Sequence, residues 1–386
     1  MSKRGSLAPR GDFPALKEYV YLNSASISII PEPVLKAKGE YERAISAVGT
    51  VSLDEEAESK AFDGPRQAAG ELLGTHPDNV AIITSATEGL CQLAWGLQPG
   101  RGQNVVSIDL EFPSVTYPWM RVARDTGAEI RLARAIPDPA ALSLDTVARL
   151  VDRNTAVLCV SHVQYATGHR FDLKSLADLA HAHGALCIID ATQSAGVVPI
   201  DVKASGIDAL VTSGYKWLCG PFGAAILYVR PELRDRLAPP IVGWRSTENQ
   251  FNFDATELIF ARDARKFESG TMNYPSGFGL GEVVRYLLDL GIDNALDHAL
   301  RLAALLREGL ERLGAEILTP AEDDRRSGIV TARFPGCNGE AVAADLNRRR
   351  VIVSPRFGST RFSPHVFNDE TDVERALAAV RTVLGA

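Results

Sequence analysis

Short apolar runs alternate with longer amphipathic runs through the first two thirds of the chain, and this alternation limits the possible folds more than any other feature. The apolar runs predict strands over residues 80–84, 104–110, 156–163, 186–190, 209–213 and 224–229. The runs between them predict helices over residues 87–98, 114–126, 140–151 and 172–183. Strands that are apolar throughout and alternate with helices are typical of βαβ units. The sequence therefore predicts an α/β fold with a mainly parallel, buried sheet and right-handed crossovers.

The pattern changes after about residue 270. Apolar residues then step by three and four from Leu296 to Leu313, which predicts one long amphipathic helix. Strands over 329–334 and 351–355 and a closing helix near 370–384 are predicted after it. A chain of 386 residues is long enough for about two domains. We expect three parts: an N-terminal arm over 1–30, a large cofactor-binding domain over 31–270 and a small C-terminal domain over 271–386.

Composition excludes several classes of function. The chain has 46% hydrophobic and 23% charged residues, which is typical of a soluble globular protein, and its net charge of −7 argues against a nucleic-acid partner. No segment approaches the ~18 consecutive apolar residues of a membrane span. The five cysteines are scattered without metal-ligand spacing, so no metal site is predicted. We expect a cytoplasmic protein that binds neither nucleic acid nor membrane.

Polar residues collect directly after the predicted strands. In open parallel sheets, ligands bind beyond the carboxyl ends of the strands. The first predicted strand is followed by Ser85, Ala86 and Thr87, where a helix begins and its free N–H groups favour an anion. Ser85 and Thr87 fit plain N-caps equally well. The fourth strand ends on Asp190, a carboxylate that is costly to bury unless it meets a cation or several donors, with a helix N-cap as the alternative.

One lysine, Lys216, lies after an apolar run in the stretch VTSGYKWLCGPFGAAILYV (211–229). A buried amine has a lowered pKa and becomes nucleophilic. Together these features favour a ligand with an anionic group, a cationic ring atom and an electrophilic carbon. Pyridoxal 5'-phosphate has all three. Lys216 would form its Schiff base, Asp190 would keep the pyridine nitrogen protonated, and Ser213 with the 85–87 turn would hold the phosphate.

With these residues in place, the chain resembles the class V aminotransferase and cysteine desulfurase-like family of fold-type I pyridoxal-phosphate enzymes, and within it the isopenicillin N epimerase-like group. The resemblance runs from YLNSA at residues 21–25 to RFSPH at 361–365. Its motifs follow in this order: TSATEG, EFPSVTYPW, SHVQYATG, DATQSAG, SGYKW, FESGTMN and SPRFGSTRFSPH. The resemblance implies a large domain with a mainly parallel mixed sheet and a smaller C-terminal α/β domain.

The resemblance also implies roles for matching residues. Lys216 matches the Schiff-base lysine and Asp190 its pyridinium partner, so these two are the expected catalytic residues. The other expected cofactor contacts are Ala86, Thr87, Phe112, Gln164, Gln193, Ser213, Tyr215 and Thr271. Thr271 matches a residue that reaches the phosphate of a neighbouring subunit, which implies a homodimer with shared active sites. The expected contacts to the amino-acid substrate are Asn23, Ala25, Arg356 and Arg361, with Arg361 gripping its carboxylate.

Two departures from the family pattern affect the expected reaction. Desulfurases stack a histidine on the cofactor, whereas this chain has Phe112, which can stack but cannot titrate. Desulfurases also carry a nucleophilic cysteine on a loop just before the carboxylate-binding arginine. Here only four residues separate Arg356 from Arg361, and none of them is cysteine. Persulfide-forming desulfuration is therefore not expected.

Several reactions begin with removal of the substrate α-proton, for which Lys216 is the expected base. Transamination is the first expectation, followed by β-eliminating carbon–sulfur lysis, then epimerisation and kynureninase-like hydrolysis. A non-catalytic binding protein of the same fold is the alternative from another class, and the presence of both Lys216 and Asp190 argues against it. Two positions remain open: His365 could contact substrate or pack in the core, and Trp244-Arg245 could reach the site or form a turn.

Overall fold

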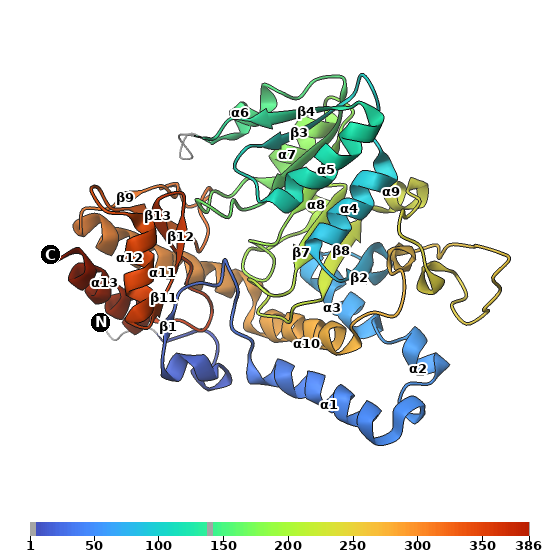
Figure 1. Cartoon of the computed structure of the whole chain (residues 1–386), viewed down its shortest axis with the longest axis horizontal. Helices are drawn as coiled ribbons and strands as arrows, with labels where there is room; N and C mark the ends of the chain where they lie inside the picture. The colour runs from blue at the N-terminus through green and yellow to red at the C-terminus, as the bar shows by residue number, and fades with distance from the viewer. Residues whose placement is uncertain (1–4, 137–141, 386) are drawn as a thin grey trace.

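The structure is a computed structural model that describes residues 5–136 and 142–385. Figure 1 shows its helices and strands. The helices are α1 (Glu32–Val48), α2 (Glu55–Ser59), α3 (Asp63–Leu73), α4 (Ala86–Leu97), α5 (Pro113–Thr126), α6 (Leu144–Ala148), α7 (Leu173–His181), α8 (Val202–Ser205), α9 (Pro231–Arg236), α10 (Tyr274–Leu290), α11 (Ile292–Arg312), α12 (Gly339–Arg348) and α13 (Glu370–Leu384). The strands are β1 (Val20–Tyr21), β2 (Val80–Ile83), β3 (Asn104–Ile108), β4 (Glu129–Ala133), β5 (Thr155–Ser161), β6 (Leu186–Asp190), β7 (Ala209–Ser213), β8 (Ala225–Val229), β9 (Glu316–Ile317), β10 (Val330–Arg333), β11 (Val351–Ile352), β12 (Ser354–Arg356) and β13 (Ser359–Phe362).

The central sheet has seven strands in the order β2-β8-β7-β6-β5-β3-β4. Strand β8 runs antiparallel to both of its neighbours, and the other neighbouring strands are parallel. The predicted mainly parallel mixed sheet is therefore confirmed, and each of the six predicted strands is present. Strand β4 at the sheet edge was not predicted, because its sequence EIRLA is partly exposed and carries two charged residues.

Both faces of the sheet are buried, which explains why its strands are apolar throughout. Along β2, Val80 and Ile82 join one apolar cluster, together with buried residues of α3, α7 and α10. Ala81 and Ile83 point to the opposite face and join a second cluster with α4 and α5. Burying one large aliphatic side chain contributes about 1.5–3 kcal/mol. Helices on both faces hold the sheet rigid and keep its carboxyl edge open for a site.

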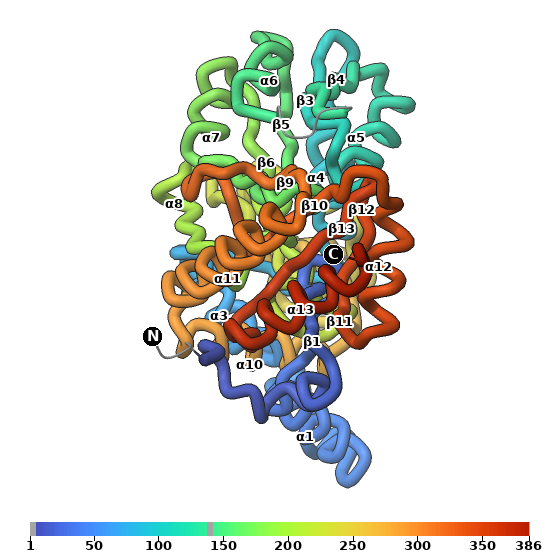
Figure 2. The backbone as a smooth tube through the Cα atoms, turned by 90° about the vertical axis from the view of Figure 1, so that its left-hand side faces the viewer, coloured from blue at the N-terminus to red at the C-terminus, as the bar shows by residue number. Residues whose placement is uncertain are grey.

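The C-terminal part has a sheet of its own, with four antiparallel strands in the order β12-β13-β10-β9. A third apolar cluster packs this sheet against α11, α12 and α13, which lie together in Figure 2. The predicted long helix is confirmed as α11. Strand β1 pairs in parallel with β11, so an N-terminal segment lies against the C-terminal part. The division into an arm and two domains remains a prediction, and residues 1–4 of the arm lie outside the described residues.

Three long helices were not predicted from the sequence: α1, α3 and α10. Helix α10 carries Gly277, Gly279 and Gly281, a spacing more typical of a loop. The structure gives these glycines a packing role, because a Cβ at Gly277 would lie only 2.2 Å from the Phe62 ring. Glycine thus lets α10 approach the start of α3 closely. The predicted helix over 140–151 is shorter, as α6, and its residues 140 and 141 lie outside the described residues.

None of the described helices combines the length and the apolar character that crossing a membrane requires. The cytoplasmic location remains a prediction.

The turn after β7 depends on a close backbone approach at Gly214. Its N–H donates to Ala224 O at 3.0 Å, and its carbonyl accepts from Gly220 N at 2.8 Å. A Cβ at Gly214 would lie 2.9 Å from Ala224 O, so Gly214→Ala must push the turn that carries Lys216 away from β8. We expect a loss of about 1–3 kcal/mol in the free energy of unfolding by urea denaturation.

Gly64→Ala is the matched control for Gly214→Ala. Gly64 is in the first turn of α3, and a Cβ there would meet nothing within 4 Å. Alanine favours a helix over glycine, so this variant should be as stable as the natural protein or slightly more stable. Equal stability of the two variants would contradict the packing role of Gly214.

Candidate active site

The carboxyl ends of the six strands other than β8 lie at one edge of the central sheet. Strand β8 is antiparallel to both β2 and β7, so β2 runs in the same direction as β7, β6, β5 and β3. A cavity opens at this edge. Its lining residues are Ser85, Ala86, Thr87, Phe112, Ser114, Ser161, Tyr165, Asp190, Thr192, Gln193, Ser213, Tyr215 and Lys216. The structure thus brings together side chains that are up to about 130 residues apart in the sequence, and most of the residues predicted to bind the cofactor are among them.

Lys216 lies in the turn after β7 and is only 7% exposed. Burial is the main cause that lowers the pKa of its amine to about 8; the charge of Asp190 opposes this shift, and the positive charges of Arg361 and Arg356 add to it. Its Nζ lies 5.2 Å from the centroid of the Phe112 ring. A buried amine that readily loses its proton is a competent nucleophile and base.

Asp190 ends β6 and is buried beside Lys216. Burial raises the pKa of its carboxyl, while hydrogen bonds from Thr192 and the charge of Lys216 favour the ionised form. The Thr192 N–H donates to Asp190 Oδ1 at 2.8 Å, a local turn contact. The residues that follow form turns, so the alternative that Asp190 caps a helix is not what the structure has. A cationic ligand atom next to this buried carboxylate would stabilise its ionised form.

The N-terminus of α4 forms the anion-favouring wall of the cavity. Ser85 caps the helix by accepting from the Glu88 N–H at 3.1 Å, so its N-cap interpretation is confirmed. The Ala86 N–H donates to Ser213 Oγ at 3.2 Å, and Thr87 Oγ1 donates to Ser114 Oγ at 2.8 Å. The positive end of this twelve-residue helix suits a phosphate group.

Gln193, Phe112 and Tyr215 line the remaining sides. The Gln193 side chain is held at both ends, because its Nε2 donates to Ala25 O at 2.9 Å and its Oε1 accepts from Trp217 Nε1 at 2.7 Å. Phe112 meets the Tyr165 ring edge to face at a centroid distance of 5.7 Å. Tyr215 stacks on Phe222 at 4.6 Å. These fixed rings and the amide shape a slot for a flat ligand.

Some predicted residues do not line the cavity directly. Gln164 is fully buried, and its Nε2 donates to Glu111 Oε1 at 2.6 Å. Its own Oε1 has no hydrogen-bond partner among the residues that the structure describes. Thr271 is exposed, and its predicted contact belongs to a neighbouring subunit, so it remains a prediction. Ala25 O accepts from Gln193, which places Ala25 beside a residue that lines the cavity, whereas Asn23 accepts from Ser354 Oγ on β12 at 2.7 Å.

The two arginines predicted to bind substrate lie on the β12–β13 hairpin beside the cavity. Arg361 is fully buried and donates to Tyr165 O and to Ser26 Oγ, both at 2.6 Å. Arg356 also donates to Ser26 Oγ, at 3.1 Å. Ser26 was not predicted from the sequence, although it directly follows the YLNSA motif and the predicted substrate residue Ala25. A hydroxyl shared by two guanidinium groups is visible only in three dimensions.

Sequence analysis also missed Glu111. Its carboxylate accepts from Ser161 N at 2.8 Å, from Ser161 Oγ and from Gln164, tying the end of β3 to the end of β5. Burial raises its pKa to about 7, with a smaller contribution from Asp190. The signal was available, because Glu111 follows an apolar run just as the carboxylate of Asp190 ends one. It supports the wall that carries Phe112.

The two open positions have packing roles. His365 is fully buried, its Nε2 is 2.8 Å from Trp217 O, and burial lowers its pKa to about 4. Arg245 is fully buried and donates to Glu58 O and to the Tyr274 hydroxyl. Neither side chain lines the cavity.

Known proteins resemble the chain along most of its length. A family model described as aminotransferase class-V matches residues 20–381. An uncharacterized aminotransferase of Bacillus subtilis is 31% identical over 95% of this chain and 94% of its own length. A cysteine desulfurase of Klebsiella pneumoniae is 33% identical over 79% of this chain and 77% of its own. The solved structure of an apo cysteine desulfurase from Thermococcus onnurineus superposes with a TM-score of 0.88 at 26% identity, with both chains fully covered.

The lowered pKa of Lys216 predicts an unusual labelling profile. With a pKa of about 8 in place of 10.5, Lys216 should be half uncharged near pH 8, roughly 100-fold more than an ordinary lysine. We expect its reductive methylation by formaldehyde, followed by peptide mass spectrometry on the cofactor-free protein, to level off above about pH 8. A methylation rate that keeps rising beyond pH 10 would contradict the effect of burial on Lys216. Asp190→Asn should lower the pH at which half of the maximal rate is reached, because it removes the negative charge that raises the pKa of Lys216.

Proposed function

The chain belongs to the class V aminotransferase family of pyridoxal 5'-phosphate enzymes, and we propose that it is an aminotransferase that moves the amino group of an amino acid to a keto acid. Its fold is that of fold-type I enzymes. The observation that carries the proposal is the buried amine of Lys216 beside Asp190, in a cavity without a cysteine. The Bacillus relative named as an aminotransferase gives further support.

The cavity fits pyridoxal 5'-phosphate in its charges and donors. When bound, this cofactor supplies an electrophilic aldehyde and a ring that withdraws electrons from the bonds at the substrate Cα. Lys216 would hold the aldehyde carbon, and Asp190 would hold the ring nitrogen. The N–H groups at the start of α4, with Ser213, would hold the phosphate. Phe112 would cover one face of the ring.

Lys216 also provides the base that the reaction needs. With the cofactor and an amino acid bound, Lys216 Nζ would take the proton from the substrate Cα and return it. The pKa of about 8 suits both steps near neutral pH. Arg361, buried and hydrogen-bonded only to neutral oxygens, would receive a substrate carboxylate.

The cysteines argue against persulfide formation. Cys159, Cys187 and Cys219 are buried, Cys91 is partly buried, and Cys337 is exposed in the turn before α12. Burial raises the pKa of the Cys219 thiol to about 12, which leaves it protonated and unreactive. None of the five lines the cavity. Carbon–sulfur lysis that needs no enzyme cysteine is the second candidate, because the Klebsiella relative is named a cysteine desulfurase.

The product of a single turnover tests the proposal. The protein loaded with its cofactor is mixed with a panel of amino acids and no keto acid. We expect the cofactor to accumulate in its aminated form with one equivalent of keto acid and no ammonia, and added keto acid should reverse the change. Ammonia released over many turnovers would instead identify a lyase.

Two variants control this measurement. Lys216→Ala should bind the cofactor without the covalent bond that borohydride reduces. Its rate should fall at least about 1000-fold, because it lacks both the residue that anchors the cofactor and the base. Asp190→Ala should keep that bond and still lose most of its rate. Full activity of Lys216→Ala would remove Lys216 from its role.

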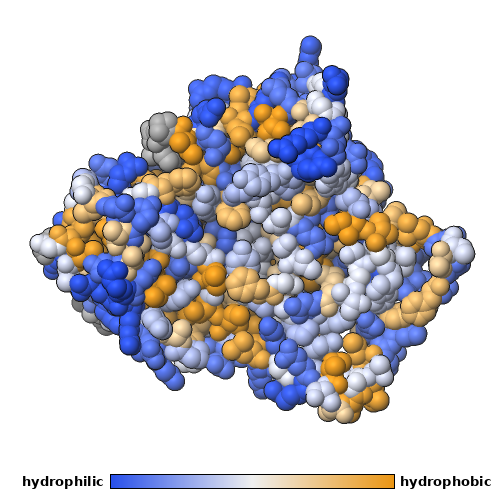
Figure 3. Space-filling view, viewed as in Figure 1, coloured by the Kyte–Doolittle hydropathy of each residue, from blue (hydrophilic) through white to orange (hydrophobic). Residues whose placement is uncertain are grey.

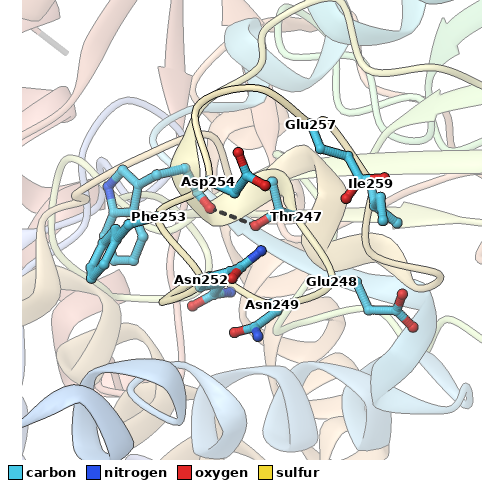
Figure 4. A pocket seen from close by; sticks show the side chains of 10 residues that line it. Thr247, Glu248, Asn249, Asn252, Phe253, Asp254, Glu257 and Ile259 are labelled. Atoms are coloured by element: carbon cyan, nitrogen blue, oxygen red, sulfur yellow. Dashed lines mark hydrogen bonds between the residues drawn. The ribbon is translucent and has the colours of Figure 1, made fainter.

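A homodimer is the second part of the proposal. The segment over 241–259 exposes apolar side chains at Ile241, Val242, Phe253, Leu258 and Ile259. It projects at the right of Figure 1, where Figure 3 shows apolar atoms at the surface. The segment also lines a cavity of its own, whose volume is about 280 Å³. Figure 4 shows side chains that line this cavity. Exposed apolar patches of this kind mark interfaces. The segment leads directly into the stretch that carries Thr271.

Sedimentation equilibrium checks the homodimer. We expect a species of twice the chain mass at micromolar concentration, and Phe253→Glu should shift it toward the monomer, because a charge in an apolar interface is costly. Tyr117→Glu is the control, since Tyr117 is also exposed but lies on α5. A monomer at all concentrations would contradict the proposal.

A further inference from the structure

The β12–β13 hairpin places two arginines side by side, and no acidic side chain among the described residues forms an ion pair with either of them. We propose that the substrate is an amino acid with a second carboxylate on its side chain, and that Arg361 and Arg356 each bind one of the two carboxylates. This inference rests on the proposed function and names its substrate class. Aspartate and glutamate are the simplest members of that class.

Arg361 has donors that the protein does not use. It is fully buried, and within the described part of the chain its Nη1 and Nη2 bond only to neutral oxygens, those of Tyr165 and Ser26. Its Nε has no hydrogen-bond partner among residues 5–136 and 142–385. Leaving a buried charged group without its partners is costly, so the arrangement favours binding of an anion.

Arg356 presents the same pattern next to it. Its Nη1 donates to Pro355 O at 2.6 Å and its Nη2 to Ser26 Oγ, while its Nε has no partner in the described part of the chain. Its guanidinium lies 5.9 Å from the centroid of the Tyr165 ring. Neither arginine forms an ion pair with a described residue, although most other arginines here do.

The hairpin register puts both side chains on one face. Ser354 pairs with Arg361 and Arg356 pairs with Ser359, so residues two apart on each strand share that face. Both guanidinium groups bond the single Ser26 hydroxyl, which fixes them close together. Tyr165, which binds Arg361 through its carbonyl, also lines the cavity that holds Lys216. The pair therefore borders the place where the substrate Cα must lie.

Electrostatics favour two negative charges over one. Burial, together with a smaller effect of the neighbouring Arg356 charge, lowers the pKa of Arg361 to about 9. One carboxylate would neutralise one guanidinium and leave the other unpaired. A substrate with two carboxylates would neutralise both. A side-chain carboxylate also offers no sulfur leaving group, so this substrate class agrees with transamination.

Matched substrate pairs test the inference on the loaded enzyme. L-aspartate and L-asparagine have nearly the same shape, as do L-glutamate and L-glutamine, and each pair differs by one charge. The first step is measured by the change in cofactor absorbance. We expect its kcat/KM to be about tenfold to 100-fold higher for the acid than for the amide in at least one pair. Arg356→Gln should reduce that ratio at least about tenfold, whereas Arg361→Gln should slow the acid and the amide alike.

A binding measurement without turnover gives a second readout. Calorimetry on the loaded enzyme should show that succinate or glutarate binds at least about tenfold more tightly than butyrate, which has one carboxylate. Arg356→Gln should abolish this difference. Arg312→Gln, at an exposed position on α11, is the matched control for loss of one charge and should preserve it.

The outcomes separate the two proposals. If dicarboxylates bind no more tightly than butyrate, or if Arg356→Gln weakens acids and amides equally, both arginines hold one carboxylate and the inference is wrong. If the preference for acids persists but ammonia is released, the substrate class is right and the aminotransferase proposal is wrong. Retained cofactor absorbance in each variant shows that the variant has folded.

Discussion

The burial of an amine and a carboxylate at the same edge of the sheet is the constraint on which the rest of the site depends. Lys216 and Asp190 are both buried, and each moves the pKa of the other toward its charged form, against the effect of burial. The positive charges of the two hairpin arginines instead lower the pKa of the Lys216 amine. This balance gives an amine that is reactive near neutral pH, and it requires a rigid frame to hold four charges in place.

The N-terminal segment is part of that frame. It pairs with β11 and then crosses the edge of the central sheet, where Ser28 N donates to Tyr215 O at 2.9 Å beside Lys216. Ala25 O holds Gln193, and Ser26 Oγ accepts from both Arg356 and Arg361. One short stretch thus connects the lysine turn, the β6 end and the arginine hairpin. A shift of the C-terminal part would move the arginines and this stretch together.

Much of the fold was predictable because its strands are buried on both faces. Such strands must be apolar throughout, and the residues that follow them then stand out, as Asp190 and Lys216 did. Helix α10 was not predicted because its glycines serve close packing, as Gly277 does against Phe62, a partner more than 200 residues away in the sequence. Glu111 is likewise a carboxylate at the end of an apolar run, as Asp190 is, but it was not predicted as part of the site. Ser26 carried no signal, because a serine in a loop has many uses.

The sequence alone determined the sheet, the lysine, the aspartate and the two arginines, since each follows from local pattern or from a family motif. Only the tertiary structure decided how they meet. It directed both guanidinium groups to one hydroxyl, left their Nε atoms without described partners, and held the cysteines away from the cavity. The physical reason is that charge compensation depends on distances through space. Those distances join segments far apart in the chain, and no local pattern contains them.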